Sequence, residues 1–151
     1  MNILFVCHGN VCRSPLAEVV FKRTIEGKKH QVQSAGFTGP GRPAAKKVRE
    51  FAETHGYDLS NHRSRLVSRE LIDWCNIVYY MDNRNLADLR ELSSRVEQKA
   101  VCLGLFIGKD KIRDPGYMKR GPRLDAILNS VVEATILGAK EGAKRNPQRG
   151  R

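Results

Sequence analysis

The sequence lacks any run of apolar residues approaching the roughly 20 that a helix needs to cross a bilayer. Its start also lacks the charged segment and long apolar stretch of a secretion signal, so we expect a cytoplasmic protein without a membrane span. Cysteine is scarce, with four among 151 residues. Because no second Cys-x2-Cys or His-x3-His cluster completes four ligands, we expect neither zinc nor another metal.

Acidic residues are also few. The chain has 16 of them and 27 basic residues, so its net charge is +11. The excess is spread along the chain and continues into a basic tail. Such a field concentrates anionic partners near the surface, including acidic protein surfaces. No recognition motif with interleaved aromatic residues accompanies the charge, so a role in binding nucleic acid is disfavoured.

Hydrophobic residues make up 40% of the chain, which is typical of one folded domain of this length. We predict a domain over residues 1–142 and a basic, disordered tail over 143–151. Apolar runs predict strands, and periodic segments predict helices that alternate with them. The strands are predicted at 3–6, 31–34, 76–81 and 99–103, and the helices at 15–27, 43–56, 68–73, 83–92 and 122–142.

This alternation implies right-handed crossovers between parallel strands. We therefore predict an α/β fold, with one four-stranded parallel twisted sheet covered by helices on both faces. Residues 104–120 lack a clear period and are predicted to form a long loop, a length that is often functional. Ligands of such sheets bind beyond the carboxyl ends of the strands.

The segment from Cys7 to Ser14 connects the first predicted strand to the first helix. Pro15 suits the first turn of a helix, and Ser14 before it is a good N-cap. Backbone N–H groups at such a position form an anion site. The loop can wrap its N–H groups around a tetrahedral oxyanion. Its phosphate-binding residues are then His8, Gly9, Asn10, Val11, Cys12 and Ser14.

Cys7 and Arg13 give this loop a specific chemical meaning. Arg13 can grip two oxygens of the anion with its guanidinium fork, and the same positive field favours the thiolate of Cys7. Gly9 permits a close approach of the backbone, and Asn10 tolerates a positive φ. Cys-x5-Arg alone is a short pattern, and a buried cysteine beside a solvated arginine is the alternative. The flanking strand and helix signals favour a nucleophilic cysteine in a phosphate-binding loop.

The stretch Val6-Cys7-x-Gly9-Asn10-x-Cys12-Arg13-Ser14-Pro15 resembles the phosphate-binding loop of the low-molecular-weight protein tyrosine phosphatases. Four further segments match the family in its order, namely Ser34-Ala35-Gly36, Asp58-Leu59-Ser60-x-His62-x-x-Arg65, Met81-Asp82-x-x-Asn85 and Asp114-Pro115. The resemblance implies hydrolysis of phosphotyrosine or other aryl phosphate monoesters through a cysteinyl-phosphate, without a cofactor. The implied partner is a phosphorylated protein or peptide, and we expect a monomer.

The resemblance also implies roles for single residues. Cys7 is the expected nucleophile, Arg13 stabilises the transition state, and Asp114 is the general acid and base. Asp-Pro also commonly begins a turn, which is the alternative for Asp114. Asn10, Ser14, Ser34 and His62 match a polar network that braces the loop, and Asp82 is expected to support the site.

Two further expectations concern substrate and oxidation. In the family, aromatic residues after Ser-Ala-Gly and after Asp-Pro wall a slot for the phenol ring. Here Gly116 follows Asp-Pro, so Phe37 and Tyr117 are the remaining candidates for substrate-binding aromatics. Cys12 can capture an oxidised Cys7 as a disulfide, and the alternative is that Cys12 only fills space.

Two other functions stay open. A thiol-dependent arsenate reductase uses a similar loop with a relay of further cysteines, for which Cys75 and Cys102 are candidates. We expect the first to open a strand and the second to lie within one, away from the loop. The second alternative is a non-catalytic, basic module that binds phosphate or nucleic acid. The presence of Cys7, Arg13 and Asp114 together favours the phosphatase.

Overall fold

The computed structural model describes residues 1–26 and 29–144. Four parallel strands form one sheet in the order β2-β1-β3-β4. Their bounds are β1 Asn2–Val6, β2 Gln31–Ala35, β3 Ile77–Tyr80 and β4 Ala100–Cys102. The predicted four-stranded parallel sheet is therefore confirmed.

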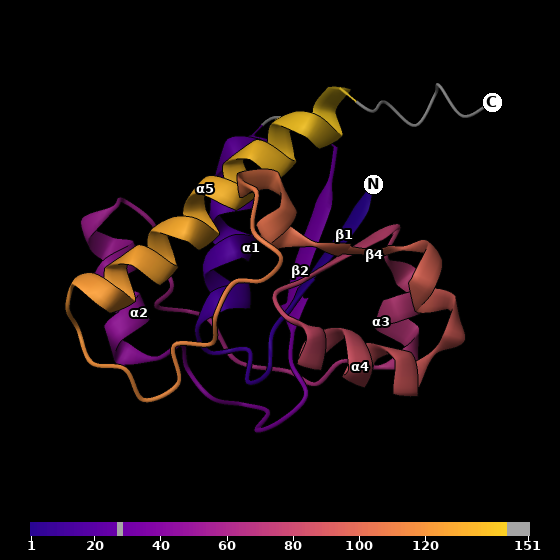
Figure 1. Cartoon of the computed structure of the whole chain (residues 1–151), viewed down its shortest axis with the longest axis horizontal. Helices are drawn as coiled ribbons and strands as arrows, with labels where there is room; N and C mark the ends of the chain where they lie inside the picture. Colours follow the sequence, from indigo (N-terminus) through magenta and orange to yellow (C-terminus); the bar gives the residue numbers. More distant parts are fainter. Residues whose placement is uncertain (27–28, 145–151) are drawn as a thin grey trace.

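Helices cover both faces of the sheet, as the alternating pattern predicts (Figure 1). The α-helices are α1 Arg13–Thr24, α2 Lys46–Thr54, α3 Arg69–Trp74, α4 Asn83–Leu92 and α5 Pro122–Lys144. Two 3₁₀ helices, η1 Ser94–Gln98 and η2 Leu103–Ile107, flank β4. Helices α1, α2 and α5 lie on one face, and α3 and α4 lie on the other.

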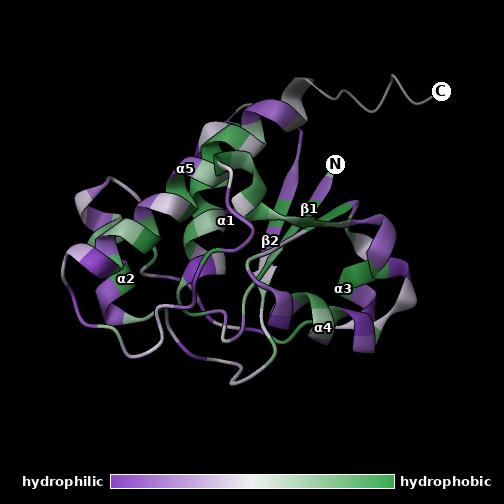
Figure 2. Ribbon diagram, in the orientation of Figure 1, coloured by the Kyte–Doolittle hydropathy of each residue, from purple (hydrophilic) through white to green (hydrophobic). Residues whose placement is uncertain are grey.

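Strand β1 is the centre of both hydrophobic cores. Ile3 and Phe5 pack into the cluster under α1 and α5, while Leu4 and Val6 pack into the cluster under α3 and α4. Successive side chains of a strand point to opposite faces, so a strand buried on both faces must be apolar throughout. Figure 2 shows this hydrophobic character along most of β1.

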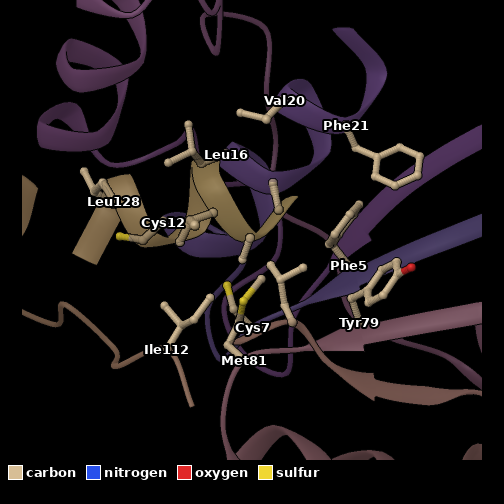
Figure 3. Packing of buried hydrophobic residues seen from close by; sticks show 14 of the residues in the cluster. Phe5, Cys7, Cys12, Leu16, Val20, Phe21, Tyr79, Met81, Ile112 and Leu128 are labelled. Carbon is tan, nitrogen blue, oxygen red and sulfur yellow. The ribbon is translucent and has the colours of Figure 1, made fainter. Parts of the chain in front are cut away.

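The aromatic ring of Phe5 fixes the position of the strand in the larger core. Its ring stacks on Tyr79 at 5.2 Å and meets Phe21 edge-on at 5.6 Å, as Figure 3 shows. Cys7 belongs to the same cluster and lies next to Met81 at the end of the strand. The packed core therefore extends to the first residue of the phosphate-binding loop.

Several boundaries differ from the predicted ones. Helix α1 begins at Arg13 rather than Pro15, and Ser14 is not its cap because the hydroxyl lies against Cys7. The predicted loop 104–120 begins only after residue 107, because the residues before that point form η2. The first two residues of η2 are buried. Cys75 ends α3 before the strand begins, and Cys102 is the last residue of β4.

The last helix passes the predicted domain end at residue 142 and continues to residue 144. The rest of the predicted tail, 145–151, lies outside the described residues. Among the described helices, none combines the length and the apolar character that crossing a membrane requires.

Candidate active site

The phosphate-binding loop lies at the carboxyl end of β1, between the ends of β2 and β3. The chain order reverses here, and ligands of open parallel sheets bind at such a point. The end of β2 approaches the loop so closely that only glycine fits at Gly36. A Cβ there would lie 2.8 Å from the backbone nitrogen of Asn10. The Ser-Ala-Gly segment thus sets the wall of the loop.

Four consecutive carbonyl oxygens of the loop, from residue 8 to residue 11, accept hydrogen bonds from the surrounding protein. Their donors, in order, are Phe37 N–H at 2.7 Å, Arg42 Nη2 at 3.1 Å, His62 Nε2 at 2.7 Å and Ala45 N–H at 2.9 Å. In a trans peptide the N–H points opposite to the carbonyl, so these bonds turn the N–H groups of residues 9 to 12 the other way. Those four N–H groups have no acceptor within the described part of the chain. They form a nest of donors suited to an oxyanion.

Asn10 holds the sharpest bend of this loop. It is fully buried and adopts φ 54°, which asparagine tolerates better than most residues. Its side-chain amide donates to the hydroxyls of Ser14 at 2.8 Å and Ser34 at 3.0 Å. Its Oδ1 accepts the N–H of Arg65 at 3.0 Å. The structure therefore brings together the polar residues predicted as a network, with His62 on the backbone carbonyl of Asn10.

The Cys7 sulfur lies beneath the start of α1. It is 3.0 Å from the Ser14 hydroxyl and accepts the Ser14 N–H at 3.4 Å. Cys7 is only 2% exposed. Burial, together with the nearby Cys7, raises the pKa of the Cys12 thiol to about 11. Cys12 therefore stays protonated at neutral pH.

Arg13, the first residue of α1, is almost fully buried. Its Nη1 donates to Asp82 Oδ2 at 2.7 Å and to the carbonyl of Ile112 at 2.7 Å. Its Nη2 is 3.8 Å from Asp114 Oδ2. Because Nη1 is occupied, Nε and Nη2 are left to form a fork with an anion. Asp82, predicted to support the site, thus positions the guanidinium.

Asp114 begins a turn and also faces Arg13 at the site. Its Oδ1 accepts the N–H of Gly116 at 2.9 Å, which makes a tight turn, while its Oδ2 faces Arg13. The side chain remains 47% exposed, so it can reach a ligand above the loop. A partly exposed carboxyl that faces the guanidinium of Arg13 can exchange a proton with the leaving oxygen of a bound phosphate ester.

Lys47, which the sequence analysis missed, anchors the Asp114 loop. Its Nζ donates to the carbonyls of Gly116 and Met118, the latter at 2.7 Å. The neighbouring Ala45 N–H binds the phosphate loop, so the start of α2 joins both loops. A lysine in the first turn of a helix is unfavourable for the helix dipole, and this was the available signal.

The guanidinium of Arg42 is bonded to backbone carbonyls of the loop after β2 and of the phosphate loop. It donates to Gly39 at 2.8 Å, Gly9 at 3.1 Å and Thr38 at 3.3 Å. Ser64, also missed, accepts the Arg42 N–H at 2.9 Å. This pair fixes the loop after β2 against the phosphate loop.

The two candidate aromatics for substrate binding lie in different surroundings. Phe37 is half-buried and packs against the core under α4. Tyr117 is fully exposed, and a Cβ at Gly116 would meet no atom within 4 Å. The site is therefore open on the side of the Asp-Pro segment. In the described residues, no three His, Cys, Asp or Glu side chains gather as metal ligands.

A model of the family described as low molecular weight phosphotyrosine protein phosphatase matches residues 2–141. The chain belongs to this family. It is therefore a phosphatase of the protein-tyrosine type, and the predicted family, fold and enzyme class are confirmed. The family also implies phosphorylated proteins as substrates.

Three similar proteins illustrate the range of the family. The protein-tyrosine-phosphatase Wzb of Salmonella typhi is 35% identical over 150 residues, which cover 93% of this chain and 97% of that protein. The structure of Vibrio vulnificus Wzb in complex with benzylphosphonate is 28% identical with a TM-score of 0.85, covering 93% of this chain and 97% of that one. The YwlE arginine phosphatase from Geobacillus stearothermophilus is also 28% identical with a TM-score of 0.84, covering 95% and 94% of the two chains.

Proposed function

We propose that this phosphatase hydrolyses phosphotyrosine in proteins with Cys7 as the nucleophile and Asp114 as the general acid and base. The Cys7 thiolate attacks phosphorus, a sulfur–phosphorus bond forms, and the bond from phosphorus to the phenol oxygen breaks. Asp114 gives its proton to that oxygen. Water then attacks the phosphocysteine and gives a proton to Asp114. Inorganic phosphate leaves, and the Cys7 thiolate is regenerated.

The observation that carries this proposal is the fixed orientation of the loop. Four carbonyls are held outward, so the N–H groups of residues 9 to 12 point to the opposite side, and Nε and Nη2 of Arg13 are left to bind an anion. Charge on the equatorial oxygens of the transition state grows where these donors already point. The Ser14 hydroxyl lies 3.0 Å from the Cys7 sulfur, where it can donate a hydrogen bond to the sulfur in the attack and when phosphocysteine breaks down.

The surroundings of the site support narrower proposals on substrate and setting. Lys119 and Arg120 are exposed near Asp114, and the whole chain carries +11, so acidic phosphoproteins are the favoured substrates. We further propose a monomer in the cytoplasm. All four cysteines are free, which suits a reducing compartment.

Phosphoarginine is a second candidate substrate group. The open side at Gly116 and the exposed Tyr117 leave no aromatic slot closed around a ring at this side of the site. A 28% identical relative of known structure is named an arginine phosphatase. The comparison of phosphotyrosine and phosphoarginine peptides therefore belongs in the test of function.

The experiment is hydrolysis of phenyl phosphate, a phosphotyrosine peptide and a phosphoarginine peptide by the wild-type protein and by Cys7→Ser. We expect the wild type to hydrolyse phenyl phosphate and phosphotyrosine, and the variant to turn over neither. Activity of Cys7→Ser close to wild type would contradict the nucleophile. Faster hydrolysis of phosphoarginine would select the second candidate.

A further inference from the structure

A hollow of about 360 Å³ lies directly beside the phosphate loop, on the face of the sheet covered by α4. His8, the residue after Cys7, forms part of its lining. Phe37 also lines it and binds the His8 carbonyl through its own N–H at 2.7 Å. The hollow therefore borders the segment that begins the phosphate loop.

One side of this hollow is apolar, and its backbone is held by hydrogen bonds. Leu66 and Val67 line it together with Phe37, and Leu66 is 47% exposed. Two backbone hydrogen bonds hold this segment against the end of β2. The Gly36 N–H donates to the carbonyl of Arg65 at 2.8 Å, and the Val67 N–H donates to the carbonyl of Gly36 at 2.7 Å. A fixed, exposed leucine in a hollow can bury a ligand side chain with little loss of conformational entropy.

The rim of the hollow carries more negative than positive charge. Asp88 and Glu91 project from α4, with Arg84 as the only basic residue among the lining residues. None of the three takes part in an ion pair with another described residue. In a chain of net charge +11, this rim disfavours acidic ligand residues and favours apolar or basic ones.

We propose that this hollow binds the apolar side chain of a residue that flanks the phosphotyrosine in the substrate. The proposal rests on the proposed function, because the phosphate must occupy the loop beside His8. An extended peptide advances about 3.3 Å per residue, so three positions on either side of the phosphotyrosine span about 10 Å of substrate in each direction. The hollow thus selects substrates by sequence, whereas the phosphate loop selects only the phosphate.

The test compares kcat/KM for phenyl phosphate and for phosphotyrosine peptides in which leucine or serine occupies each of the three positions on either side. At one position we expect the wild type to prefer leucine over serine by about five- to tenfold, the effect of burying part of an apolar side chain. Leu66→Ser should lose this preference and leave phenyl phosphate unchanged. Leu105→Ser, at a 62% exposed leucine outside the hollow, is the matched control and should keep it.

Two outcomes would overturn the proposal: a wild type without preference at any position, or an unaltered preference in Leu66→Ser. Leu66→Trp, which fills the hollow, should also abolish the preference. Calorimetry measures the affinity of the same peptides for Cys7→Ser, with and without Leu66→Ser. Because Cys7→Ser does not turn the peptides over, this affinity tests the leucine preference apart from catalysis. A protein that binds the peptides with the leucine preference but hydrolyses no phenyl phosphate would refute the proposed function and leave the hollow supported.

Discussion

Substitution of Asn10 separates two contributions to the phosphate loop, side-chain hydrogen bonds and backbone strain. Asn10→Gly removes three side-chain hydrogen bonds, to Ser14, Ser34 and the backbone of Arg65, while glycine accepts φ 54° freely. At about 1 kcal/mol for each bond, the free energy of unfolding should fall by about 3 kcal/mol. Asn10→Ala loses the same bonds and should cost about 1 kcal/mol more, because alanine is strained at positive φ.

Thermal unfolding measures both steps. For a domain of this size 1 kcal/mol corresponds to about 2–4 °C, so Asn10→Gly should lower Tm by about 6–12 °C and Asn10→Ala by a further 2–4 °C. Asn61→Ala, at an exposed asparagine, is the control and should change Tm little. Equal Tm values for the glycine and alanine variants would refute the strain argument, and a wild-type Tm for Asn10→Gly would refute the network.

Three other predictions follow from the site. Asp114→Asn should slow phenyl phosphate far more than an ester whose leaving group needs no proton, and equal losses would contradict its role as acid. The pKa of Cys12 is raised from 9.0 to about 11, so folding favours the thiol, and this stabilisation of about 2–3 kcal/mol should be complete below pH 9 and lost between pH 9 and 11. Denaturant unfolding measures the free energy of unfolding between pH 9 and 11, which should fall less steeply with pH for Cys12→Ala than for the wild type. Parallel pH dependences of the two proteins would contradict the raised pKa of Cys12. Peroxide should link Cys7 to Cys12, as mass spectrometry can detect, and Cys12→Ser should regain less activity on reduction; recovery equal to wild type would leave Cys12 as a packing residue.

Local signals were sufficient for most of the secondary structure. The bounds of α4 agree with the prediction at both ends. Its first turn is capped by Asp82, which accepts the Asn85 N–H at 3.0 Å. The four parallel strands followed from apolar runs alternating with helical periods. The position of the loop at the end of β1 followed from the same alternation.

The parts that sequence could not predict depend on contacts between distant segments. The hydroxyl of Ser14 can cap a helix or face a sulfur, and only the folded loop brings Cys7 within 3.0 Å. Lys47 meets a carbonyl 71 positions away, for which no local pattern exists. The exposure of Tyr117 likewise depends on how the Asp-Pro segment turns in space.

The central claim is that turnover passes through a phosphate bound to Cys7. The most direct measurement is acid quenching of the enzyme during hydrolysis of an aryl phosphate, followed by mass spectrometry of its peptides. We predict phosphate on the peptide that contains Cys7 in the wild type, more of it in Asp114→Asn with an ester that needs no acid, and none in Cys7→Ala. Turnover without any phosphorylated Cys7, or phosphate on another residue, would contradict the mechanism.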